Sequence, residues 1–283
     1  MKNIWRYRTA ALVLLVLPFI AVSQELQVMS YNIRFDNPAD GENAWGNRKA
    51  HLVSQIAYHA PDLVGTQEGL AHQLADIASG LPQYAYFGKG RDAGENEGEY
   101  SAIFYRTDRL ELLSEGTFWL SQTPEIPSRG WDAALNRICT YGFFRHRASG
   151  RRFLMFNTHF DHIGQEARRE SVQLIRSKIK EINREGFPVI LTGDLNLEPE
   201  TEPIQILSGS MTDAFMAAGA AAYGPAGTFN GFDCTSPATR RIDYIFISGD
   251  RLSVSRFATL SETREKGYPS DHFPVLATLV LLP

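Results

Sequence analysis

The sequence predicts a single α/β domain over residues 24–283. Two observations point to this class: apolar stretches of strand length recur along the chain, and helical patterns lie between several of them. A third is that no linker, internal repeat or low-complexity tract follows residue 24. Hydrophobic residues make up 43% of the 283 residues and charged residues 21%, which excludes a disordered, collagen-like or coiled-coil chain.

Seven apolar stretches have the length and composition of strands. They are Leu26–Ile33, Leu63–Thr66, Ala102–Tyr105, Phe153–Asn157, Val189–Thr192, Ile242–Ile247 and Val275–Leu282. The middle of the chain, about residues 84–145, is also strand-rich, with turn signals at 88–98 and 124–131. We therefore expect further strands in that region.

Three segments are expected to be helices. The clearest is Gln165–Arg184, where apolar residues recur with helical spacing. Its apolar face contains Val172, Ile175, Ile179 and Ile182. The other two helices are expected over Arg48–Tyr58 and Leu70–Leu81.

Residues 1–23 have the features of an export signal. Lys2, Arg6 and Arg8 form a basic start, an apolar run covers Ala10–Val22, and small residues precede a cleavage point near Ser23. The run is short for a membrane span and no second run follows it. We therefore expect an exported protein, periplasmic or extracellular, without a membrane span after cleavage. An uncleaved anchor is the alternative.

Cleavage would remove three basic residues and no acidic ones, leaving 25 Lys and Arg against 32 Asp and Glu, a formal charge of −7. Proteins that bind nucleic acid non-specifically are usually basic, so this charge argues against such binding. The two cysteines, Cys139 and Cys234, could form a disulfide in an oxidising compartment, and two independent buried thiols are the alternative.

Most of the apolar runs end in, or lie next to, residues that can bind a metal or move a proton. These residues lie in Ser30-Tyr31-Asn32, Gln67-Glu68, Asn157-Thr158-His159, Gly193-Asp194-Leu195-Asn196, Arg241-Ile242-Asp243 and Ser270-Asp271-His272. Each group alone could be a turn, a helix cap or a surface pair. Strand ends that meet at one edge of a sheet form a crevice, where α/β proteins place their sites. Six such groups together predict a catalytic site.

These segments resemble the endonuclease/exonuclease/phosphatase superfamily of metal-dependent phosphoesterases, and they occur in that family's order over nearly the whole mature chain. The most specific pieces are Gly193-Asp194-Leu195-Asn196 and Ser270-Asp271-His272. The resemblance implies a four-layer α/β/β/α sandwich with two packed mixed β-sheets. The segments 157–162 and 130–140 are similar to those of exported bacterial members, with Asn136 where proline is expected.

The resemblance also implies a metal site. Glu68 is expected to be the principal ligand, with Asn32 and Asp271 beside it or reaching the ion through water. Oxygen ligands of this kind suit Mg²⁺ or Mn²⁺. The ion would polarise a phosphoryl oxygen and stabilise charge on the leaving oxygen.

Five further residues receive catalytic roles from the resemblance. Asp194 is expected to accept the proton of the attacking water, and Asn196 to orient that water or the phosphate. His272 would hydrogen-bond the phosphoryl oxygen while Asp243 fixes its tautomer. His159 would protonate the leaving group, because an ordinary histidine pKa of about 6.5 suits a general acid at neutral pH.

Three more residues could contact phosphate or substrate. Glu99 resembles a position near the phosphate in several branches of the family. Arg137 could bind a phosphate through two N–H groups. Arg168 lies on the first turn of the long helix, where its charge and the helix N-terminus could face an anion. A salt bridge or a solvated charge is the alternative for each.

The expected function is an exported, metal-dependent phosphoesterase that acts as a monomer and hydrolyses phosphodiester bonds first of all, with phosphomonoester bonds as the second option. The substrate could be nucleic acid, a phospholipid headgroup or a small molecule. The alternatives are a phosphatase for small phosphorylated sugars or lipids and a non-catalytic phosphate-binding protein. A Gly-x-Ser-x-Gly elbow and a P-loop are both missing from the sequence. A metallo-β-lactamase-like dizinc site would be short of histidines, since only His272 follows His162.

Overall fold

The computed structural model describes residues 1, 25–92, 96–248, 250–265 and 267–282. The expected export signal, apart from Met1, lies outside the described residues, so export stays a prediction. Among the described residues, no helix is long and apolar enough to cross a membrane.

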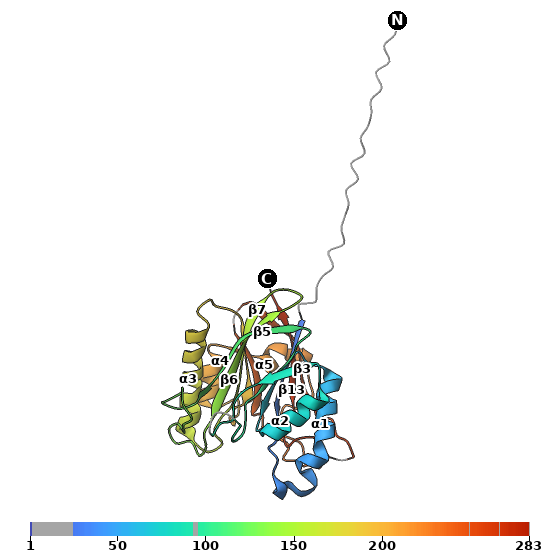
Figure 1. The fold of residues 1–283 in the computed structure, drawn as a ribbon, viewed down its shortest axis with the longest axis vertical. Helices are drawn as coiled ribbons and strands as arrows, with labels where there is room; N and C mark the ends of the chain where they lie inside the picture. Colours follow the sequence, from blue (N-terminus) through green and yellow to red (C-terminus); the bar gives the residue numbers. More distant parts are fainter. Residues whose placement is uncertain (2–24, 93–95, 249, 266, 283) are drawn as a thin grey trace.

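Two β-sheets form the centre of the molecule (Figure 1). One contains β1 (Glu25–Asn32), β2 (Leu63–Gln67), β3 (Tyr84–Phe87), β4 (Ile103–Arg106), β10 (Ala222–Tyr223), β12 (Leu252–Thr259) and β13 (Val275–Leu281). The other contains β5 (Leu110–Trp119), β6 (Ile138–His146), β7 (Arg152–His159), β8 (Val189–Asp194), β9 (Thr212–Asp213) and β11 (Asp243–Ser248). Their strand orders are β10-β12-β13-β1-β2-β4-β3 and β5-β6-β7-β8-β11-β9.

Both sheets are mixed. In the first, β1 runs parallel to β2 and antiparallel to β13. In the second, β8 runs parallel to β7 and antiparallel to β11. The parallel pairs need long crossovers, and helices supply them.

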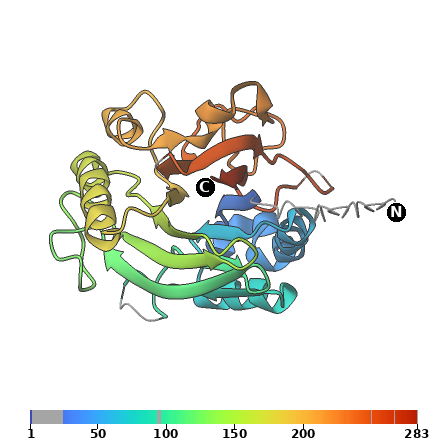
Figure 2. The ribbon, with the colours of Figure 1, turned by 90° about the horizontal axis from the view of Figure 1, so that it is seen from above.

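Helices cover the outer faces of both sheets. The helices α1 (Trp45–His59) and α2 (Ala71–Gly80) pack on the seven-stranded sheet, and α3 (Gln165–Ile182) and α4 (Glu202–Ser208) pack on the six-stranded sheet. Figure 2 shows α3 and α1 on opposite sides of the molecule. The short α5 (Ala214–Ala218) packs against β11 and β12, and two 3-10 helices cover Pro38–Asn43 and Gly219–Ala221. The expected four-layer sandwich is confirmed.

Alternation along the strands divides the core into three layers. In β1, Leu26 and Val28 point between the sheets, while Met29 and Tyr31 point toward α1 and α2. Side chains on successive strand residues face opposite ways, so every second residue shares one layer. Near the ends of β1, β7 and β8, polar residues take over the inter-sheet positions, and this change places the site.

All seven expected strands and all three expected helices are present, with ends shifted by at most three residues. The largest shift is in α1, which begins at Trp45 instead of Arg48. Strand β12 and the short α4 and α5 were not expected.

The two cysteines, Cys139 and Cys234, are not joined by a disulfide, and both are described residues. Cys139 is buried and Cys234 is at the surface, so the alternative of two buried thiols holds only for Cys139.

Replacing Gly65 by alanine should destabilise the fold by about 1–3 kcal/mol, the usual cost of overpacking. Gly65 lies in β2 and faces the other sheet, where a Cβ atom would collide with the side chains of Thr192 and Asn157. Urea unfolding measures the change. Gly46→Ala in α1 is the matched control, because nothing lies within 4 Å of the added carbon and alanine favours a helix. Equal stability of the two variants would contradict the close contact between the sheets.

Candidate active site

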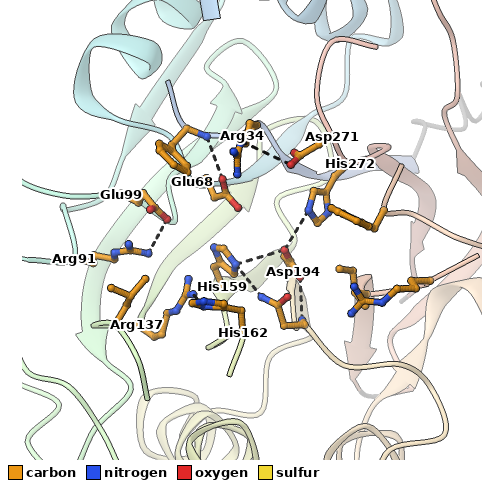
Figure 3. Close-up of a pocket in the computed structure, with 16 residues that line it drawn as sticks. Arg34, Glu68, Arg91, Glu99, Arg137, His159, His162, Asp194, Asp271 and His272 are labelled. Atoms are coloured by element: carbon orange, nitrogen blue, oxygen red, sulfur yellow. Dashed lines mark hydrogen bonds and ion pairs between the residues drawn. The ribbon is translucent and has the colours of Figure 1, made fainter. Parts of the chain in front are cut away.

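The site lies at one end of the inter-sheet layer, where strands from both sheets end or begin (Figure 3). Asn32 is the last residue of β1, His159 of β7 and Asp194 of β8, whereas Asp243 is the first residue of the antiparallel β11. The register pairs Asp194 with both His159 and Asp243 on the neighbouring strands. Six sequence segments therefore converge because of strand direction and register.

Two carboxylates and an imidazole form a group that could hold a metal ion. Glu68, Asp194 and His272 each offer one ligand atom, and these atoms lie within 4.8 Å of one another. Glu68 has a left-handed backbone (φ 65°) that turns its side chain toward the group, and its Oε2 accepts a hydrogen bond from the amide of Phe35 at 3.1 Å. A divalent cation would balance the charges of the half-buried Glu68 and the buried Asp194, so these two carboxylates fit such an ion, and His272 lies beside them.

The other two expected metal ligands lie beside this group. The Nδ2 of Asn32 donates to Glu68 Oε1 at 2.9 Å and to Asp194 Oδ2 at 3.0 Å, so Asn32 presents its nitrogen to the carboxylates. Its Oδ1 accepts from the amide of Arg34 at 3.0 Å. The Oδ2 of Asp271 lies 3.8 Å from Arg34 Nε. The ligand roles of Asn32 and Asp271 stay predictions.

His272 forms the expected pair with Asp243. Its Nδ1 lies 2.9 Å from Asp243 Oδ2, and its Nε2 lies 3.7 Å from Asp194 Oδ2. Burial lowers the pKa of His272, but the carboxylates of Asp243 and Asp194 outweigh it and raise this pKa well above the usual value. This shift favours the protonated ring, whose Nε2–H faces the carboxylate of Asp194.

His159 faces the same carboxylate but has the opposite pKa shift. Its Nε2 lies 3.5 Å from Asp194 Oδ2 and 3.1 Å from Asn196 Nδ2. Burial and the charges of Arg137 and Arg91 lower the pKa of His159 well below the usual value. The expectation of an ordinary pKa for this histidine is therefore wrong. A phosphate anion beside the ring would raise the pKa, because a negative charge favours the imidazolium.

Asp194 has the titration expected of a proton acceptor. Burial and the nearby charge of Asp243 raise the pKa of Asp194 to about 7. Its Oδ1 accepts from the backbone N–H of Asn196 at 2.9 Å. A general base with a pKa near the operating pH is efficient, and the left-handed turn at Asn196 (φ 49°) brings its amide back toward His159.

These groups lie in a cavity of about 570 Å³ whose remaining wall is rich in cations. Arg34, Arg91, Arg137 and Arg240 all line it. Arg91 pairs with Glu99 at 2.6 Å, and burial together with the charge of Glu68 raises the pKa of Glu99 to about 7. Several guanidinium groups around a metal-binding group suit a phosphate ester.

A buried arginine outside the cavity connects two of the site segments. Arg48 of α1 is 4% exposed and donates through Nη1 to the carbonyls of Ile33 at 2.6 Å and Pro269 at 3.0 Å. Its Nη2 donates to the carbonyl of Arg34 at 2.6 Å. These bonds tie the loop after Asn32 to the segment before β13 that carries the aspartate and histidine of the site.

The structure brings ten of the eleven expected site residues together and leaves one outside. Arg168 lines a neighbouring cavity at the start of α3, with Asp132 and Glu202, and its Nη1 donates to the carbonyl of Asp161. Its place on the first helical turn is as expected, but Arg168 is not among the residues that line the catalytic cavity. Its role as a phosphate contact stays a prediction.

Sequence reasoning did not assign Arg34, Arg91 or His162 to the site. Arg91 lies in the segment 88–98 with turn signals, and nothing in that pattern distinguished it. Arg34 follows the expected ligand Asn32 by two residues, and its left-handed backbone (φ 56°) cannot be read from the sequence. His162 belongs to the segment 157–162 that resembles exported bacterial members, so a signal for it was present.

The chain belongs to the endonuclease/exonuclease/phosphatase family, whose family model matches residues 29–272. Members of this family are metal-dependent phosphoesterases, which are hydrolases. The match spans all the metal-binding and catalytic residues expected from the sequence.

Two solved structures from Bacteroides have the same fold and similar sequences. A mannosyl-6-phosphatase of Bacteroides thetaiotaomicron VPI-5482 has 43% sequence identity and a TM-score of 0.87, covering 90% of this chain and 100% of that structure. A family member from Bacteroides vulgatus has 40% identity and a TM-score of 0.86, covering 91% and 99%.

A curated relative, an uncharacterized protein of Acanthamoeba polyphaga mimivirus, is 31% identical over 161 residues, which cover 54% of this chain and 60% of that protein. The chain spans no more than 60% of the length of the curated relatives it matches.

Proposed function

We propose that this protein is a divalent-metal-dependent phosphatase that hydrolyses phosphate monoesters of small polyhydroxylated molecules such as sugars. The observation that carries the proposal is the group of Glu68, Asp194 and His272 in a cavity of about 570 Å³ with an arginine-rich wall. A cavity of this size suits a small molecule, since ligand pockets are about 300–1,000 Å³. The likeness to a mannosyl-6-phosphatase supports the choice of a sugar phosphate.

The residues of the chain divide the reaction among them. A bound divalent ion would polarise the phosphoryl oxygen and stabilise the negative charge that develops. Asp194 accepts the proton of the attacking water, and His272 donates its Nε2–H to a phosphoryl oxygen while Asp243 holds the ring. His159 becomes protonated beside the substrate phosphate and donates that proton to the leaving oxygen. The opposite pKa shifts of the two histidines fit this division of roles.

The ester preference separates this proposal from the phosphodiesterase expected first from the sequence. We expect the mature chain to hydrolyse p-nitrophenyl phosphate faster than bis-p-nitrophenyl phosphate with Mg²⁺ or Mn²⁺. EDTA should abolish both activities, and added metal should restore them. Faster turnover of the diester would support a phosphodiesterase instead. Absence of turnover with bound metal would support a non-catalytic phosphate-binding protein.

A further inference from the structure

Two loops that carry none of the metal-binding group build one wall of the catalytic cavity. Leu135 and Arg137 come from the loop between β5 and β6, and His162 comes from the loop between β7 and α3. Figure 3 shows Arg137 and His162 next to each other, on the side of His159 away from His272. This wall therefore lies beyond His159 as seen from the metal-binding group.

A buried carboxylate joins the two loops. Asp161 is 1% exposed, and its Oδ2 accepts from the amides of Ala134 at 3.1 Å and Leu135 at 3.3 Å. Its Oδ1 accepts from the amides of Ile163 at 3.0 Å and Gly164 at 2.7 Å. Burial raises the pKa of Asp161, but these backbone hydrogen bonds outweigh it and lower this pKa to about 2. The wall is thus held in one arrangement by a permanent negative charge.

The hydrogen bond between Arg137 and His162 fixes which nitrogen of the histidine can donate. Arg137 Nη2 lies 3.1 Å from His162 Nδ1. A guanidinium only donates, so Nδ1 must accept. The proton of the neutral ring is then on Nε2. The exposed His162 therefore offers an N–H donor to the cavity.

We propose that His162 binds a hydroxyl oxygen of the leaving group through Nε2–H and thereby selects hydroxylated phosphate esters over apolar ones. This inference rests on the proposed phosphatase function and names its substrate contact. His159, the expected proton donor to the leaving oxygen, lies between this wall and Asp194, to which its Nε2 is 3.5 Å away. The metal-binding residues and His162 lie on opposite sides of His159, so His162 is placed to contact the leaving group of the ester.

The test compares two primary phosphate esters with the same number of carbon atoms, a hexose 6-phosphate and n-hexyl phosphate. His162→Ala should lower kcat/KM for the hexose 6-phosphate about three- to tenfold through KM, as expected for one lost hydrogen bond. It should leave kcat/KM for n-hexyl phosphate within about twofold of the wild-type value. His162→Gln should recover part of the loss, because its amide can donate. His72→Ala is the control, because this exposed histidine of α2 pairs with Asp36 and does not line the catalytic cavity.

Equal losses on both esters would show that His162 acts on the phosphate or on the hydrolysis step. Unchanged kinetics would show that it does not contact the substrate. Either result overturns the inference. A binding measurement separates this from failure of the proposed function. Calorimetric titration with the non-hydrolysable methylene phosphonate of the hexose, in Mg²⁺, should show weaker binding to His162→Ala than to the wild type. Weaker binding to the variant, in a protein that shows no turnover, would support the His162 subsite and overturn the proposed phosphatase activity. Absent binding, or equal binding to both proteins, would overturn the subsite.

Discussion

Replacing Glu68 by alanine should lower metal-dependent turnover by at least about 10²–10³-fold, the loss typical of removing one main electrostatic group from an active site. Glu68 is one of three residues whose ligand atoms lie within 4.8 Å of one another. Without Glu68 the group keeps only the carboxylate of Asp194, and a divalent ion would bind poorly. The measurement is kcat with p-nitrophenyl phosphate as Mg²⁺ is varied, together with Mn²⁺ binding followed by electron paramagnetic resonance.

The fold should tolerate this change, because the lost contacts of Glu68 are hydrogen bonds at the edge of the cavity and none of its atoms belongs to the apolar core. Circular dichroism and urea unfolding check this. Glu181→Ala is the matched control, since its carboxylate lies on the surface of α3 and pairs with Lys178. Wild-type turnover and Mn²⁺ affinity in the Glu68 variant would show that the ion is held elsewhere.

Asp243→Asn should lower kcat by up to about 10⁴-fold, as seen when the carboxylate of a carboxylate–histidine pair becomes an amide. Asp243 accepts from His272 Nδ1 at 2.9 Å and contributes to the raised pKa of His272. The amide would favour the wrong tautomer and remove the charge that stabilises the imidazolium. The pKa of His272 should fall, which NMR titration of its ring protons can follow.

A double-mutant cycle tests whether the two residues act as a unit. If Asp243 works through His272, then adding Asp243→Asn to His272→Ala should cost little more than His272→Ala alone. Additive losses would mean that Asp243 has an independent role. The variant should fold, because asparagine has about the volume of aspartate and carries no charge to bury. The Oδ1 atom of Asp243 accepts no hydrogen bond from the described residues, so no such bond is lost there.

The apolar pattern predicted the strands that are buried on both faces. Strand β8, for example, lies inside a sheet and all its residues are buried, so it begins with the apolar run Val189, Ile190 and Leu191. Strand β12 escaped detection because it lies next to the edge strand β10, and half-buried or exposed residues interrupt its pattern. The helices α4 and α5, with seven and five residues, are too short to show a helical period.

The polar residues at strand ends predicted the centre of the site but not its wall. Their chemistry could be recognised because Glu68 and Asp194 end or follow apolar runs and His272 precedes one. The sequence could not tell that Arg168 lines a neighbouring cavity, because helix position alone does not show which cavity a side chain enters. His162 was missed as a donor because its role depends on a hydrogen bond to Arg137, 25 residues earlier in the chain.

Local alternation of apolar and polar residues, together with residue chemistry, was enough to predict the α/β class, most strands and the residues able to bind a metal or move a proton. Which of these residues share the cavity, and how they titrate, depends on how distant strands pack. His159 and His272 are chemically identical, yet their pKa values shift in opposite directions because one lies near two arginines and the other between two aspartates. Burial and distance set those shifts, and both arise from the packing of strands that are far apart in the chain.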